Sequence, residues 1–150
     1  MSSQFQKELG SNQLAARKFL GTARVDLSSL RFIQGREIVP QIVHELVGVF
    51  RATGCRRFDI ENHVPVLISP SELSTALDAS SLNRKDLSKR SQDGSLPFLK
   101  PGDYKLFSGI HGRHRIRAAT RFLDPNDRWW VISLYLVDNT GKNRQRQRKR

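Results

Sequence analysis

Arginines cluster with glycines in one stretch of the chain, FSGIHGRHRIRAATRFL, which runs from Phe107 to Leu123. Gly109 and Gly112 interrupt its apolar start, and four arginines follow: Arg113, Arg115, Arg117 and Arg121. Glycine lets backbone N–H groups approach a ligand closely, and a helix N-terminus carries unpaired donors and partial positive charge. Guanidinium groups bind phosphate oxygens in pairs. The spacing therefore predicts a phosphate-binding loop that leads into a helix.

The residue types assign different roles within this stretch. We expect Arg115 and Arg117 to be the principal phosphate ligands and Gly112 to allow close backbone approach. Gly109, Arg113 and His114 complete the predicted phosphate site. Further upstream, Gln34 and Arg36 follow a predicted strand, where side chains commonly reach a ligand, and we expect them to be accessory ligand-binding residues.

The elements around the arginines must position them. Ile116, Ala119, Thr120 and Leu123 have the spacing of a buried helical stripe, and Arg113, Arg117 and Arg121 recur every four residues beside it. The apolar run from Tyr104 to Ser108 predicts a strand before the glycines. This order of strand, turn and helix favours a ligand site. The alternative is a core helix whose arginines only solvate its outer surface.

The run GRHRIRAA, from Gly112 to Ala119, resembles the arginine box of the ParB and sulfiredoxin superfamily. Its chromosome-partitioning members carry Gly-Glu-Arg-Arg-x-Arg-Ala-Ala, and its sulfiredoxins carry Gly-Cys-His-Arg. Gln34 and Arg36 are similar to a Gln-x-Arg pair in the partitioning proteins. The resemblance implies a box that binds nucleotide phosphates. Arg113 departs from both patterns, since it replaces the acidic residue of one and the reactive cysteine of the other, so neither of those chemistries carries over.

A longer part of the chain, roughly from Phe19 to Tyr135, resembles an uncharacterised fungal family associated with large mobile elements. The resemblance rests on three stretches, FLGTARVDL, GCRRF to ENHVPVLI, and FSGIHGRHRIRAA. It implies shared ancestry and says little about activity.

The pattern of elements predicts an α/β fold of the mixed α+β kind, a small mixed sheet with flanking helices that resembles the ParB and sulfiredoxin fold. We expect an N-terminal extension with a short helix (1–21), the folded domain (22–138) with a mobile insertion (80–95), and a disordered basic tail (139–150). The insertion could act as a lid over the arginines or be a plain surface loop.

Turn and cap residues set the expected elements within the domain. Apolar runs predict a first strand, a strand whose proline favours an edge position or an early break in the ladder, and a final strand. Proline at the first turn and a Ser-Pro-x-Glu cap predict two helices. The expected strands are Arg24 to Leu27, Val64 to Ile68 and Trp130 to Leu136, and the helices are Pro40 to Thr53 and Ser69 to Leu77, with a loop from Leu27 to Pro40.

Composition limits the class of protein. At 150 residues the chain is long enough for one domain, and its net charge is +12. No run approaches the eighteen or so apolar residues that span a bilayer, so we expect no membrane partner and an intracellular location. Cys55 is the only cysteine, which excludes a disulfide framework, and we expect its thiol to be buried. The four histidines lack zinc-ligand spacing, and we expect no metal site.

Two kinds of function remain open beside the recognition of a nucleotide or a nucleic-acid backbone. A nucleotide hydrolase, phosphotransferase or nuclease on the same site would use a nucleoside triphosphate with magnesium, and such chemistry usually needs a carboxylate that holds the metal. The arginine stretch has none, so Asp59, Glu61 or Asp103 would have to supply it. For Asp59 and Glu61, local salt bridges with Arg56 and Arg57 are favoured. A catalytically inert protein-interaction module is the other alternative.

The C-terminal stretch GKNRQRQRKR holds half of the net charge and no acid. Such a run predicts a nucleic-acid arm or a nuclear-import signal, and hence a nuclear location. Its cations are Lys142, Arg144, Arg146, Arg148, Lys149 and Arg150.

We predict that this tail contributes to non-specific binding of duplex DNA. If its cations contact phosphates, log K should fall with log salt at a slope of about −0.9 per contact, and deletion of Lys142 to Arg150 should flatten that slope. A salt series on the full and shortened chains measures the difference. Equal affinity and equal slope would leave import as the remaining role of the tail.

Overall fold

The computed structural model describes residues 17–33, 37–87 and 95–137. They form one five-stranded sheet with the strand order β1-β5-β3-β4-β2. The strands are β1 (Lys18–Asp26), β2 (Leu30–Phe32), β3 (Val64–Ile68), β4 (Phe107–Gly109) and β5 (Trp129–Leu136), and the helices are α2 (Pro40–Thr53), α3 (Pro70–Ser80), α4 (Arg84–Leu87) and α5 (Arg113–Phe122). Strands β1 and β5, and β3 and β4, pair antiparallel, whereas β3 and β5, and β2 and β4, pair parallel. The predicted mixed sheet with flanking helices is confirmed.

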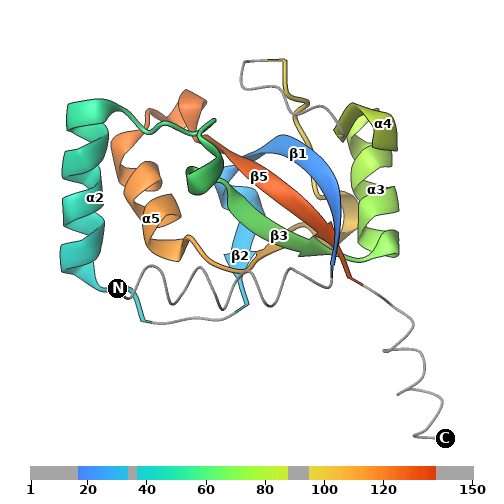
Figure 1. Ribbon diagram of the computed structural model, residues 1–150, viewed down its shortest axis with the longest axis horizontal. Coiled ribbons are helices and arrows are strands. Elements are labelled where there is room, and N and C mark those ends of the chain that lie inside the picture. Colours follow the sequence, from blue (N-terminus) through green and yellow to red (C-terminus); the bar gives the residue numbers. More distant parts are fainter. Residues whose placement is uncertain (1–16, 34–36, 88–94, 138–150) are drawn as a thin grey trace, which may run out of the picture.

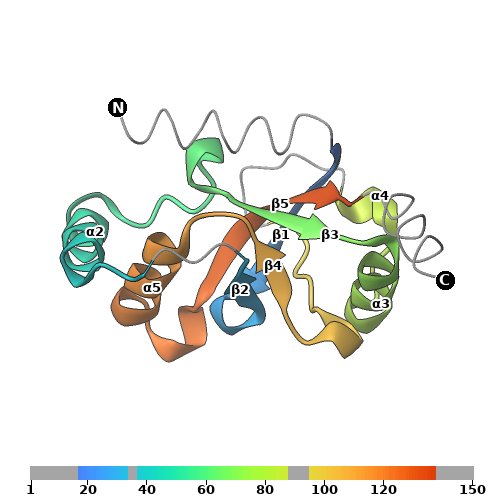
Figure 2. The ribbon, with the colours of Figure 1, turned by 90° about the horizontal axis from the view of Figure 1, so that it is seen from below.

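Two groups of helices flank the sheet. Helices α2 and α5 lie at one end of the molecule, and α3 and α4 lie at the other, with the strands between them (Figure 1). The perpendicular view shows the same separation (Figure 2). The described end of the predicted 80–95 insertion includes α4, which lies across the sheet from α5. This part of the insertion does not cover the arginines.

The core is built on one face of β5. Trp130, Ile132 and Leu134 alternate along this strand and are fully buried. In the parallel pairing, Ile132 lies opposite Val64 and Leu134 lies opposite Val66, so both strands send apolar side chains to the same face. The predicted strand over Val64–Ile68 is confirmed at both ends.

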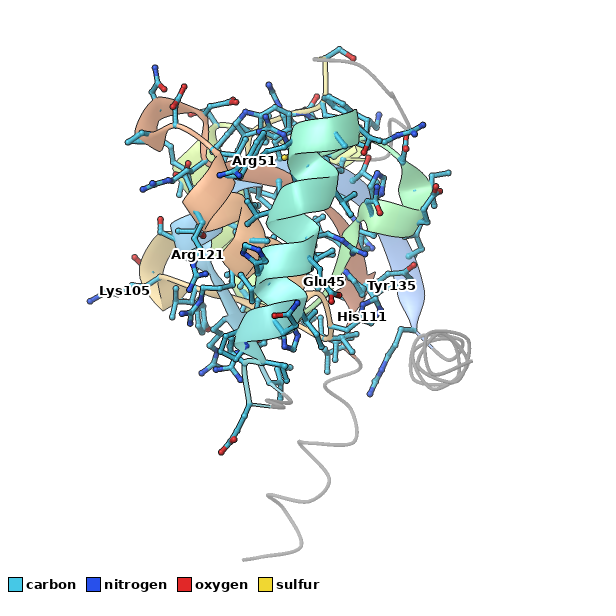
Figure 3. The ribbon with its side chains drawn as sticks, turned by 90° about the vertical axis from the view of Figure 1, so that its left-hand side faces the viewer. Glu45, Arg51, Lys105, His111, Arg121 and Tyr135 are labelled. Atoms are coloured by element: carbon cyan, nitrogen blue, oxygen red, sulfur yellow. The ribbon has the colours of Figure 1, made fainter. Side chains whose placement is uncertain are left out.

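Helix α5 packs between this core and α2. Ile116, Ala118 and Ala119 are buried, and Phe50 of α2 lies against both Phe122 and Trp130, with ring centroids 6.0 and 5.9 Å away. Figure 3, which looks onto α2, shows α5 behind it. The alanines bring the α5 backbone close to its neighbours, so the orientation of the helix about its own axis is fixed by packing.

The prediction of a buried stripe on this helix is wrong at one position, Thr120. Thr120 is exposed, and its hydroxyl donates to the carbonyl of Ile116 at 2.9 Å. Ala118 takes a buried position in its place. Ala118 and Thr120 lie 200° apart around an ideal helix at 100° per residue, so they face different sides. The apolar spacing alone does not show which of the two is buried, because that depends on how α5 packs against α2 and the sheet.

The N-terminal boundary and the first loop also differ from expectation. Strand β1 begins at Lys18, so residues 18–21 belong to the sheet and not to an extension. A register shift between Phe19 and Gly21 breaks the alternation by which the sequence would reveal a long strand. The predicted loop contains β2, which is recognisable only by its pairing with β4.

Of the two alternatives for Pro65, the sheet edge is wrong, because β3 has β4 on one side and β5 on the other, and the early break in the ladder is confirmed, because the pairing with β4 stops at Val66. Its carbonyl accepts the N–H of Ile110 at 2.9 Å, just after β4 ends at Gly109. The N–H and C=O groups of one strand residue point to the same neighbouring strand, so an N–H at Pro65 would also face β4. Because β4 has already ended at Gly109, the pairing of β3 with β4 does not need that donor. Strand β4 itself begins three residues later than predicted, after a 3-10 turn (Gly102–Tyr104).

The capped helices follow the sequence closely. Helix α2 covers the predicted residues, and Ser69 and Glu72 form the predicted capping box at the start of α3. Helix α3 continues to Ser80, past the expected end. Leu87 of α4 is fully buried, so this part of the predicted mobile insertion joins the core. Residues 88–94 lie outside the described residues, as does the predicted tail.

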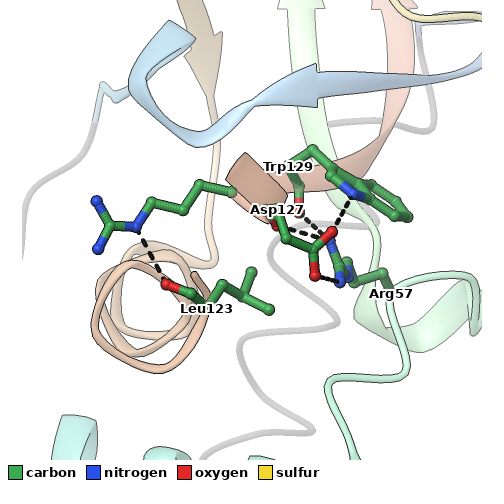
Figure 4. A network of polar contacts seen from close by, with 5 residues as sticks. Arg57, Leu123, Asp127 and Trp129 are labelled. Atoms are coloured by element: carbon green, nitrogen blue, oxygen red, sulfur yellow. Dashed lines mark hydrogen bonds and ion pairs between the residues drawn. The ribbon is translucent and has the colours of Figure 1, made fainter. Parts of the chain in front are cut away.

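A polar network ties the end of α5 to the start of β5 (Figure 4). Arg57 donates to the Asp127 carboxylate at 2.9 Å and to the carbonyls of Asp127 and Trp129 at 3.1 Å each. Its guanidinium also lies 3.8 Å from the centre of the Trp129 ring. Trp129 in turn donates to Asp127 at 2.8 Å. One face of this indole is therefore already covered, as expected for a structural tryptophan.

We predict that acid weakens this network. The hydrogen bond from Arg57 holds the pKa of Asp127 below its ordinary value of 3.8. Because the folded state binds this proton less tightly than the unfolded chain does, the stabilisation is present above pH 3.8 and is lost as the pH falls through the lowered pKa. The effect should be at most about 1 kcal/mol, since the carboxylate is half exposed and water screens it. Asp127→Asn should be less stable near neutral pH and should lose less of its stability on acidification, as measured by denaturant unfolding; identical acid profiles would contradict this.

Candidate phosphate site

The N-terminus of α5 has no side-chain cap. Gly112 is its N-cap residue, with φ of 106°, and no side chain donates or accepts a capping bond there. A Cβ at this position would lie 3.1 Å from Cγ2 of Val64, so both the backbone conformation and the space favour glycine. The first turn contains no acidic residue. The positive end of the helix dipole is therefore not balanced by a side chain of α5.

Arg115 lies against the interior at this helix start. Burial lowers the pKa of its guanidinium, which nevertheless stays charged. Its Nη1 donates to the carbonyl of Asn62 at 3.4 Å, a long contact at the limit of a hydrogen bond. Among the described residues, no carboxylate forms an ion pair with it. A largely desolvated cation without a carboxylate partner favours an anion beside it.

His111 belongs to the same surroundings. More than a third of the residue remains exposed, yet burial of the ring lowers its pKa, and the charge of Arg115 lowers it further. The second effect means that the imidazole lies within electrostatic range of the Arg115 charge. His111 is thus a neutral imidazole near pH 7, able to donate one hydrogen bond without adding charge. The sequence reasoning gave it no role.

His114 has a structural contact. Its Nε2 accepts the backbone N–H of Val39 at 3.0 Å, at the residue that caps α2. This nitrogen carries no proton in that bond, so a neutral ring has its proton on Nδ1, and only that nitrogen could donate to a phosphate. His114 also fixes the start of α2 against the first turn of α5.

Arg115 and Arg117 do not converge as predicted. They lie two residues apart on a helix, which turns their side chains to opposite faces. Arg115 points inward, whereas Arg117 is exposed, as is Arg121 one turn further on. Arg113, at the first helical position, is half-buried and has an interaction of its own. The arginine box is therefore divided between an inner residue at the helix start and an outer row.

Gly109 also has a role different from the predicted one. It is buried in β4, where a Cβ would lie 2.7 Å from the ring of Phe32 on β2. The absence of a side chain makes room for this aromatic residue. Gly109 therefore serves strand packing and does not line the helix start.

The candidate carboxylates are not assembled into a metal site. Asp59 pairs with Arg56 at 2.7 Å, which confirms the predicted local salt bridge, and Glu61 is exposed. Within the described ranges, no group of three histidine, cysteine, aspartate or glutamate side chains is placed to bind a metal ion. Gln34, Arg36 and the tail cations lie outside those ranges. Cys55 is buried, and burial raises the pKa of its thiol, as expected for an unreactive cysteine.

The structure adds one group that sequence reasoning missed. The carbonyl of Asn62 accepts Nε1 of Trp130 at 2.8 Å in addition to the guanidinium of Arg115. It therefore links the core tryptophan to the inner arginine. No sequence signal could have identified this carbonyl, because every residue has a backbone carbonyl and only the tertiary fold determines which groups it contacts.

The comparison with known proteins gives one family. Residues 18–149 match the family described as "Protein of unknown function (DUF3723) N-terminal domain". Neither the curated proteins nor the solved structures gave a significant match. No helix in the described part of the chain has the length and apolar character needed to cross a bilayer. The family match includes all five strands and every residue of the helix start, and the chain therefore belongs to the DUF3723 N-terminal domain family.

Proposed function

We propose that the start of α5 binds the phosphate group of a nucleotide. Arg115 would be the principal cationic ligand, and the absence of a side chain at Gly112 would let the phosphate approach the backbone closely. The observation that carries this proposal is the inner position of Arg115, which has a single long hydrogen bond and no described carboxylate partner. A bound phosphate would supply the missing negative charge. His111, neutral and adjacent, would donate a hydrogen bond to it.

Physical chemistry favours an anion at this position. A cation withdrawn from water interacts more strongly with an opposite charge than an exposed one does, since the local dielectric is lower. A phosphate there would also lie at the uncapped end of α5, whose dipole adds to the attraction. Both effects attract negative charge, so they favour a phosphate group at the start of α5.

The resemblance of GRHRIRAA to the arginine box of the ParB and sulfiredoxin superfamily supports the same proposal. The order of β4, glycine turn and α5 agrees with a box at a helix start. In the structure, Arg115 is the arginine of this run that burial desolvates, as the lowered pKa of its guanidinium shows. We therefore carry over Gly112 and Arg115 as phosphate-binding residues, and we propose membership of that superfamily and of the fungal mobile-element group on sequence grounds alone.

A nucleotide-dependent enzyme is the second candidate. It would need a metal-holding carboxylate beside the phosphate, and the described acids closest in sequence to Asn62 are Asp59, paired with Arg56, and the exposed Glu61. Their arrangement favours a binding function over a catalytic one. Nucleotide turnover that requires both magnesium and Arg115 would instead favour the enzyme.

We predict that Arg115→Ala weakens nucleotide binding much more than Arg117→Ala does. Loss of a charge-assisted phosphate contact is worth roughly 1.5 to 3 kcal/mol, or about ten- to over a hundredfold in affinity. Arg117 faces solvent on the opposite side and should have little effect. Calorimetry with a panel of nucleoside triphosphates and with inorganic phosphate, each with and without magnesium, measures the difference.

Thermal unfolding of the same variants separates binding from folding. Leu123→Ala removes a buried side chain and should cost about 2 to 5 kcal/mol of stability, which sets the scale of a structural defect. Arg115→Ala should unfold close to the parent. Equal binding by the two arginine variants, or a stability loss in Arg115→Ala as large as that of Leu123→Ala, would show that Arg115 is structural.

We also propose that the chain is nuclear, on the basis of the tail cations from Lys142 to Arg150. A run of Lys and Arg without acids has the composition of an import signal. Fusion to a fluorescent protein should show nuclear accumulation that is lost when the tail is deleted. Uniform distribution of both fusions would contradict the proposal.

A further inference from the structure

The outer side of α5 carries cations that the phosphate site does not use. Arg117 and Arg121 are exposed and lie four residues apart, so they point to the same side, separated by about 6 Å along the helix axis. Thr120, between them on this side, turns its hydroxyl back to the Ile116 carbonyl. No acidic residue occurs anywhere in α5. The outer side is thus cationic and free of carboxylates of its own helix.

Cations from two other elements lie on the same side. Figure 3 shows Arg51 of α2 and Lys105, which follows the 3-10 turn before β4, on the same side of α2 as Arg121. Glu45 and His111 lie on the other side of α2 in that view. Within the described residues, no ion pair engages Arg51, Lys105, Arg117 or Arg121. We call the two α5 residues, Arg117 and Arg121, the outer cation surface.

An uncompensated surface of this kind costs the monomer a small amount of stability. Like charges four residues apart on a helix repel each other by a few tenths of a kcal/mol. Nothing in the packing requires arginine at these exposed positions. A polyanion would supply the opposite charge that α5 itself lacks.

We infer that the outer cation surface binds the sugar-phosphate backbone of nucleic acid, at a site separate from the nucleotide site at Arg115. Exposed guanidinium groups bind backbone phosphates bidentately, and such contacts are independent of base sequence. A membrane surface is the alternative that the test must separate: α5 itself presents no large exposed apolar side chain, but Tyr104 and Leu106 beside Lys105 are exposed. Helix geometry turns Arg115 to the opposite side of α5, so the two sites are expected to bind independently.

The test uses the full chain and variants with equal net charge. Arg117→Ala/Arg121→Ala removes two cations from the surface. Arg84→Ala/Lys100→Ala removes two exposed cations beyond α3, on the other side of the sheet. Binding to a random-sequence duplex is measured by fluorescence anisotropy over a series of salt concentrations. All four residues are exposed, so both variants should fold, and thermal unfolding checks that they do.

We expect the α5 variant to lose up to about 1.8 units of the log K against log salt slope, at about 0.9 per contact, and to bind at least about tenfold more weakly at 0.1 M salt. The control should keep the slope of the parent. Arg117→Lys/Arg121→Lys should also keep it, because the charge remains. Nucleotide binding by the α5 variant should match the parent, which distinguishes this site from the one at Arg115.

Several results would overturn the inference. An equal loss in the α5 variant and its control would show that only net charge matters, and no loss in either would leave the tail as the sole arm. Retention of duplex binding together with loss of binding to anionic lipid vesicles would assign the surface to a membrane instead. A loss of duplex binding in Arg115→Ala as large as that in the α5 variant would show that the two sites are one.

Discussion

The burial of α5 between α2 and the sheet is the constraint on which the candidate site depends. Ile116, Ala118 and Ala119 must face the core, and an α-helix turns 100° per residue, so every other side chain of the helix is then fixed in direction. Arg115 is turned inward, and Arg117 is turned out. A helix with the same arginines and a different buried side would present a different ligand site. The packing of these three residues therefore decides which arginines of the helix face inward.

This packing removes much of the water around the guanidinium of Arg115, a charged group that is more stable in water. Desolvation of Arg115 has a cost that the long contact with the Asn62 carbonyl offsets only in part. The same carbonyl holds the indole of Trp130, the largest fully buried side chain of the core. The candidate site is thus linked to the buried core through one backbone carbonyl. A site held in this way needs little further ordering when a ligand binds.

Membership of the DUF3723 N-terminal domain family identifies the chain by descent and leaves its activity open. Fold alone does not imply function either, since one fold can carry many kinds of site. The proposals therefore rest on the two sides of α5, where burial, charge and direction distinguish an inner phosphate site from an outer polyanion surface. This division also explains how one arginine-rich helix could contact a small nucleotide and a nucleic-acid backbone without competition between them.

The sequence by itself determined the features that arise from local chemistry. The helix over Pro40–Thr53, the cap at Ser69 and the strand Val64–Ile68 were predictable because proline, cap residues and apolar runs act on their immediate neighbours. The glycine before α5 was predictable for the same reason, since a left-handed backbone and a helix start both favour it. The cluster of arginines was visible as well.

Tertiary structure alone decided how those residues combine. The three-residue strand β2 exists because β4 lies beside it, and Gly109 serves the ring of Phe32 because that strand is there. His114 contacts Val39, 75 residues away, and Arg115 contacts Asn62, 53 residues away. Such contacts depend on which surfaces the core brings together, and no local pattern records them. The sequence determined which charges the helix carries, and the packing of the helix determined which of them face inward, because burial of apolar surface fixes its rotation.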